Sequence, residues 1–276
     1  MEGENMIIDG AASLHEKNHE EEKKSAFERQ QAIMDKIREV GFARYAETLP
    51  NLKDAFDLAK HQPEAGIKKC GCCMDEGTPW GVHAAMQLLS EEEFDEWFKK
   101  NQPTHLSTHD GCGAESLLAK RLSEEQGIDF SEAKIIAAGW IKAKAEKYGV
   151  ELIHIPSEKM KRPKDFHDAR VCYIDATGKF NYEGVAGLPD GFTITDSFST
   201  LEPTLLQAGV AEAIIFGDHG YGNDGKLLNE ENKFVFVAIA NSWEELEKMK
   251  DELAEFKFAN SLGKEITIDG FVAPEN

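Results

Sequence analysis

Helical segments alternate with short apolar runs along most of the chain, and this alternation is the feature that most constrains the fold. The segment 131–148 ends at Gly149, a typical helix-capping residue, and the apolar run 150–155 follows at once. A strand that directly follows a helix favours parallel pairing. The expected helices are 25–48, 80–89, 91–99, 114–125, 131–148, 201–208 and 243–256, and the expected strands are 65–73, 104–107, 150–155, 170–174, 211–216 and 234–240. The sequence therefore predicts an α/β protein with a mostly parallel central sheet flanked by helices.

The length of 276 residues is enough for one large domain or two small ones. Residues 1–23 are polar and acidic, which is typical of a solvated tail or a frayed helix start. Residues 24–276 are expected to form a single α/β domain.

The chain is strongly acidic, with 31 basic and 51 acidic side chains and a formal charge of −20. This charge argues against nucleic acid and against an anionic membrane surface as partners, because both need a basic face. There is no apolar run of the ~18 to 20 residues that a transmembrane helix needs. The N-terminal residues also lack the pattern of a signal peptide, so a cytoplasmic location is expected.

The five cysteines point to metal or redox chemistry rather than to a disulfide framework. An odd number, with four of them close together in the sequence, suits a secreted scaffold poorly. The cysteines are Cys70, Cys72, Cys73, Cys112 and Cys172.

Two short motifs carry candidate metal ligands. Cys73-Met74-Asp75 and His109-Asp110-Gly111-Cys112 each lie where an expected strand gives way to a loop, and sites assemble at such strand ends in α/β sheets. Two thiolates and one imidazole bind zinc well, and they leave the fourth tetrahedral position open, as in catalytic zinc sites. Asp75 lies two residues from a ligand and could contact a metal-bound water or displace it.

Two other roles for these cysteines stay open. Cys70 or Cys72 could complete a purely structural zinc site, or Cys70 and Cys73 could act as a thiol redox pair. Cys172 lies in an apolar run and is expected to be an inert core thiol.

The pair of motifs resembles the beta-class carbonic anhydrases, which show Cys-x-Asp followed by His-x-x-Cys-Gly. The resemblance covers residues 65–183 and includes Gly113-Ala114 and the later run Val171–Lys179. It implies that Cys73, His109 and Cys112 bind Zn²⁺ and that Asp75 is the catalytic carboxylate beside it. In the family an arginine two residues beyond the aspartate keeps it off the metal. Here Gly77 has that place, so Lys68 or a distant residue would have to substitute.

The activity that the resemblance implies is reversible hydration of carbon dioxide to bicarbonate by a zinc-bound hydroxide. Because two thiolates offset the charge of the metal, an alkaline activity profile is expected, with His83 and His105 as candidate proton acceptors. The resemblance also implies a homodimer or larger homo-oligomer, in which residues 25–48 could cross to the neighbour. The alternatives are a hydrolase of carbonyl sulfide or carbon disulfide, or a catalytically silent zinc protein in which Asp75 closes the site.

A weaker resemblance lies further along the chain, within residues 184–276. Residues 200–222 are similar to the family's helix, strand and histidine loop, with Gly222 where the metal-binding cysteine would be. This region could be a degenerate second repeat, or an extension that only shares elements common to α/β proteins.

Overall fold

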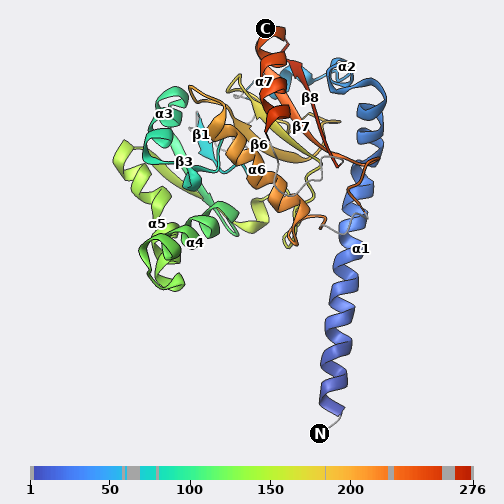
Figure 1. The fold of residues 1–276 in the computed structure, drawn as a ribbon, viewed down its shortest axis with the longest axis vertical. Coiled ribbons are helices and arrows are strands. Elements are labelled where there is room, and N and C mark those ends of the chain that lie inside the picture. Colours follow the sequence, from blue (N-terminus) through green and yellow to red (C-terminus); the bar gives the residue numbers. More distant parts are fainter. Residues whose placement is uncertain are drawn as a thin grey trace.

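The structure is a computed structural model, which describes residues 3–57, 60, 69–78, 81–183, 185–222, 227–256 and 265–274, with side chains from residue 19 onward. In these residues the strands form two four-stranded sheets, and every pairing is parallel. Helices lie against both sheets (Figure 1). The expected α/β class with a parallel sheet is therefore confirmed.

The first sheet contains the two sequence motifs. Its strands are β1 (Cys70–Cys72), β2 (Val82–His83), β3 (His105–His109) and β4 (Glu151–Ile155), in the order β2-β1-β3-β4. The helices α3 (Glu91–Asn101), α4 (Gly113–Gln126) and α5 (Phe130–Tyr148) accompany it. Apolar side chains from α3, α5 and β3 form one core, which includes Phe94, Trp97, Leu106 and Ile141.

The second sheet repeats the same strand order. Its strands are β5 (Val171–Asp175), β6 (Gly191–Thr195), β7 (Phe234–Ala240) and β8 (Ile266–Val272), in the order β6-β5-β7-β8. The helices α6 (Glu202–Phe216) and α7 (Trp243–Glu255) cover one face. The other face packs on α1 (Gly3–Val40) and α2 (Phe42–Glu47). Both faces are covered, which explains why β7 is a continuous apolar run.

The two sheets meet at β2 and β6. The His83 backbone N–H donates to Thr195 Oγ1 over 2.9 Å, and the Thr193 N–H donates to the Met74 carbonyl over 3.1 Å. Residues 156–170, which include a short 3₁₀ turn at Ser157–Lys159, connect β4 to β5 and so join the two halves of the chain. The first cysteine motif therefore lies at the boundary between the halves.

Helix α1 extends far beyond the body of the molecule towards the N-terminus (Figure 1). It begins at Gly3, so the segment expected to be a polar tail belongs to this helix. No helix in the described part of the chain is both long enough and apolar enough to span a membrane.

Three local predictions were wrong. The segment 80–89, expected as a helix, contains β2 and a 3₁₀ turn at Met86–Leu88. The run 211–216, expected as a strand, continues α6, because a short apolar run fits a buried helix as well as a strand. Strands β6 and β8 were not expected at all. The expected strand 65–73 contains β1 at Cys70–Cys72, and its residues 65–68 lie outside the described residues.

Candidate metal centre

The structure brings together the three residues that the motifs single out. Cys73 follows β1, His109 ends β3, and Cys112 is the N-cap of α4. One ligand atom from each lies within 4.8 Å of the other two, and all three side chains are buried. Because β1 and β3 are parallel neighbours, their carboxyl ends deliver both motifs to the same edge of the sheet.

The arrangement of the three residues fits a tetrahedral metal ion. The two sulfurs are 3.9 Å apart, close to the about 3.8 Å that two 2.3 Å zinc–sulfur bonds at a tetrahedral angle would give. His109 Nδ1 lies 3.0 Å from the Asp110 carbonyl, so it is the donor nitrogen in the neutral ring. Nε2 of His109 is buried and has no partner in the described part of the chain. The cluster could therefore hold a metal ion that prefers sulfur and nitrogen ligands.

The electrostatics of the cluster favour a thiolate at Cys112. The hydrogen bond with Cys73 holds the pKa of Cys112 well below its usual range, and the neighbouring His109 adds to this effect. The same hydrogen bond, together with burial, raises the pKa of Cys73 well above its usual range. Burial alone would lower the pKa of His109, but the contact with Cys112 outweighs it and raises that pKa. The two sulfurs therefore differ, and Cys112 is the more acidic thiol of the pair.

Asp75 lies beside this cluster and is held by two cationic side chains. Its Oδ2 is 3.2 Å from Arg162 Nη2, and its Oδ1 is 3.2 Å from His167 Nδ1. Burial alone would raise the pKa of Asp75, but His167, followed by Arg162 and His109, outweighs burial and lowers that pKa. Asp75 is therefore an ionised carboxylate: Oδ2 accepts a hydrogen bond from Arg162, and Oδ1 makes an ion-pair contact with His167 that lacks hydrogen-bond geometry.

The arginine that pairs with Asp75 is Arg162, which is distant from it in the sequence. Gly77, where the family has its arginine, adopts a φ of +75°, and a Cβ there would lie 2.7 Å from the Lys161 backbone nitrogen. The Lys161 N–H donates to the Gly77 carbonyl over 3.0 Å, so the 161–162 segment packs directly on this glycine. There is no room for a side chain at Gly77. The arginine that pairs with Asp75 comes instead from the 161–162 segment that packs on this glycine. Lys68 lies outside the described residues.

His167 links Asp75 to a further buried carboxylate. Its Nδ1 is also 3.2 Å from Glu76 Oε1, and Glu76 Oε1 accepts the Asp168 N–H over 2.8 Å. Burial lowers the pKa of His167, but Asp75 and Glu76 outweigh it and raise that pKa to about 9. At neutral pH His167 is therefore an imidazolium between two carboxylates. No local pattern in the sequence indicates this role, because His167 is 92 positions from Asp75.

A small cavity of about 20 Å³ opens beside Asp75 and Cys73. Its polar lining is Asp75 and His167, and its apolar lining comes from Ala85, Phe192, Val210 and Ile214. A cavity of this size holds one water molecule or a molecule only slightly larger. Phe192, Val210 and Ile214 belong to the second half of the chain, so both halves form its walls.

The other candidates from the sequence do not join the cluster. Cys70 and Cys72 pack in a separate buried group with Ile153, and Cys172 lies in the core of the second sheet, where burial raises the pKa of its thiol. Within the described residues the structure therefore gives no support to a zinc site completed by Cys70 or Cys72. His83 is fully buried and its pKa falls to about 4, which makes it a poor proton acceptor at neutral pH. His105 begins β3, about 13 Å along the strand from His109.

Comparison of the chain with protein-family models, with curated proteins and with solved structures finds no match.

Proposed function

We propose that Cys73, His109 and Cys112 bind Zn²⁺ and that the protein catalyses the reversible hydration of carbon dioxide to bicarbonate. The observation that carries this proposal is the pairing of Asp75 with Arg162 and His167 next to a three-ligand cluster. A carboxylate held between two cations, by a hydrogen bond from Arg162 and an ion pair with His167, is kept from becoming a fourth metal ligand. The fourth coordination position then stays available for water, which is the condition for catalysis at such a site.

A zinc ion bound here would supply a water molecule of lowered pKa as the nucleophile. The protein's own residues would orient this water molecule and enclose the substrate. Asp75 can accept a hydrogen bond from that water, and Arg162 and His167 fix the direction of its carboxylate. The apolar wall formed by Ala85, Phe192, Val210 and Ile214 suits an uncharged substrate.

The size of the cavity supports a very small substrate. A volume of about 20 Å³ leaves room for a molecule near the size of water. Carbon dioxide is a linear molecule of three atoms without charge, and it fits these walls better than a larger or charged substrate would. Carbonyl sulfide and carbon disulfide have the same shape but are larger, so they remain the alternative substrates.

Metal content and hydration rate, measured together, test the proposal. We expect one zinc per chain by emission spectroscopy, and stopped-flow hydration whose rate rises between pH 6.5 and 9. Cys112→Ser should lose both the zinc and the activity. Cys172→Ser, a buried cysteine outside the cluster, is the matched control and should keep both.

Other results would favour the other functions. Stoichiometric zinc without hydration at any pH would identify a silent zinc protein. Hydrolysis of carbonyl sulfide or carbon disulfide without carbon dioxide hydration would identify the related hydrolase. A wild-type protein that binds no metal would refute the proposed function altogether.

We further propose that the chain forms a homo-oligomer through α1. The N-terminal part of this helix projects from the body (Figure 1), and an isolated helix gains little stability in water without a packing partner. Sedimentation of the full chain and of a variant that lacks residues 1–18 tests this, since the variant should sediment as a smaller species.

A further inference from the structure

Arg170 is a fully buried arginine for which the described residues supply no carboxylate partner. It precedes β5, its relative exposure is 0%, and its guanidinium lies 3.6 Å over the centre of the Phe27 ring. Nη1 makes two long hydrogen bonds of 3.3 Å, to the Phe27 carbonyl and to Gln31 Oε1. Nε is buried and has no partner in the described part of the chain. The guanidinium is therefore stacked on the Phe27 ring, but its N–H groups make few and long hydrogen bonds.

The charge of Arg170 persists despite this burial. Burial lowers its pKa to about 10, with a smaller contribution from the nearby charge of Arg38, although Tyr221 and Asp35 act in the opposite direction. Arg170 is thus still a cation at neutral pH. A buried charge that lacks a counter-ion is costly, so structures that keep one usually pair it with another group or with a ligand.

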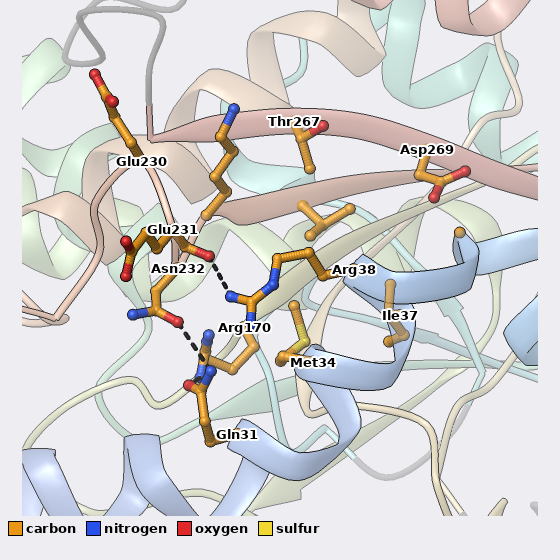
Figure 2. A pocket seen from close by; sticks show the side chains of 13 residues that line it. Gln31, Met34, Ile37, Arg38, Arg170, Glu230, Glu231, Asn232, Thr267 and Asp269 are labelled. Carbon is orange, nitrogen blue, oxygen red and sulfur yellow. Dashed lines mark hydrogen bonds between the residues drawn. The ribbon is translucent and has the colours of Figure 1, made fainter.

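A cavity of about 350 Å³ opens at Arg170, between α1 and the edge formed by β7 and β8. Figure 2 shows Gln31 and Arg38 reaching into it from α1, next to Arg170. Lys233 lines the same cavity, and no described residue pairs with its ammonium group. The volume falls in the lower range of pockets that bind small organic molecules.

The acidic residues that line the cavity do not neutralise Arg170. Asp269 uses Oδ2 to accept the Phe42 N–H over 2.6 Å and Oδ1 to accept the Gly270 N–H over 2.7 Å. In Figure 2 the carboxylates of Glu230 and Glu231 point away from Arg170. Arg38 donates to the Glu231 backbone carbonyl over 2.6 Å and to Asp35 over 2.7 Å. The place beside the Arg170 guanidinium is thus cationic and lined with hydrogen-bond donors.

We propose that this cavity is a binding site for a small oxyanion-bearing molecule, whose phosphate or carboxylate group is the counter-ion of Arg170. Planar guanidinium groups pair well with both kinds of oxyanion, because two N–H donors can face two oxygens. Lys233 would contribute a second positive charge, and the amide nitrogen of Asn232 a neutral donor; the amide nitrogen of Gln31 already donates to Asp35 and to Asn232. The site is separate from the metal centre, so the proposal does not depend on the proposed function.

Calorimetric titration of the metal-free full chain tests this proposal, with inorganic phosphate, pyrophosphate and citrate as probes. Sodium chloride at equal ionic strength is the salt control. We expect at least one probe to bind with a Kd below 1 mM. A preference for the two phosphate probes would identify a phosphate compound as the ligand class, and a preference for citrate would identify a carboxylate.

Variants then locate the binding. Arg170→Gln should weaken the best probe at least tenfold, and Lys233→Gln should weaken it at least threefold. Lys248→Gln, which removes an exposed lysine from α7, is the control and should leave the affinity unchanged. If Arg170→Gln fails to fold, Lys233→Gln decides the question alone. The proposal is overturned if no probe binds below 10 mM, or if the Lys233→Gln variant that folds binds as well as the wild-type chain.

Discussion

The ion pair between Arg162 and Asp75 is open to a direct energetic test. Both side chains are nearly buried, with exposures of 8% and 6%, and their charged atoms are 3.2 Å apart. Removal of one partner from a buried pair costs about 3–5 kcal/mol, because it leaves an uncompensated charge. Since His167 still holds the other oxygen of Asp75, we expect Arg162→Met to lower the free energy of unfolding by about 2–3 kcal/mol.

A double-mutant cycle separates the interaction energy of this ion pair from the energy lost when the packing of either side chain changes. The four proteins are the wild-type chain, Arg162→Met, Asp75→Asn and the double variant, each unfolded in urea at pH 7.5 without metal. We expect a coupling energy of about 2 kcal/mol between the two sites. Arg121→Met, on the exposed side of α4, is the control and should change stability by no more than about 0.5 kcal/mol. A coupling energy within about 0.5 kcal/mol of zero would refute the view that Arg162 holds Asp75.

Three further predictions concern single positions. Gly77→Ala should destabilise the protein by about 2–3 kcal/mol, because the φ of Gly77 is +75° and a Cβ would lie 2.7 Å from the Lys161 backbone. Urea unfolding measures this loss, and a loss below about 0.5 kcal/mol would contradict the prediction. His83 has its pKa lowered to about 4 mainly by burial, so the unfolded chain takes up a proton below pH 6.5 while the folded protein does not. The contribution of this ring to the free energy of unfolding is therefore complete above pH 6.5 and falls towards pH 4. Between pH 7.5 and pH 4.5 the wild-type chain should lose about 2.5 kcal/mol more of its free energy of unfolding than His83→Gln does. Parallel curves of stability against pH would show the reasoning to be wrong. Ser90→Ala should cost about 1 kcal/mol, because Ser90 and Glu93 form a capping box at α3, whereas Ser116→Ala should cost less; equal losses would speak against the cap.

The sequence predicts the elements whose signals are local. Ser90 and Ser242 cap α3 and α7, and Gly149 ends α5 in a left-handed conformation, as their residue types indicate. Strands β4, β5 and β7 also lie where short apolar runs follow helices or turns. In each case the few residues at the boundary determine the conformation.

The errors arise where tertiary contacts decide. The run 211–216 is apolar enough for a strand, but it continues α6, which covers the second sheet. Strand β2 has only two residues and owes its conformation to its neighbours β1 and β6 rather than to its own pattern. Strand β6 was not predicted either, because Gly191–Thr195 is short and has few apolar residues.

The candidate site divides in the same way. Cys73, His109 and Cys112 were predicted because motif spacing and the ends of parallel strands bring them together, and the structure places them within 4.8 Å. Arg162 and His167 were not predicted, since they reach Asp75 only through the packing of residues 161–168 on the first motif. Gly77 held the one usable signal, because a glycine at the family's arginine position implies close backbone approach there.

The connection 156–170 between the two sheets has a consequence for how the chain tolerates rearrangement. Connections between similar halves usually accept insertions and new termini. Here the connection carries Arg162 and His167, which contact Asp75, and Arg170, which lines the second cavity. Circular permutants opened at Gly127, an exposed turn between α4 and α5, should keep both sites. Permutants opened within 161–168 should lose the ion pairs of Asp75 with Arg162 and His167. The connection between the two halves is thus expected to tolerate new termini less well than the turn at Gly127.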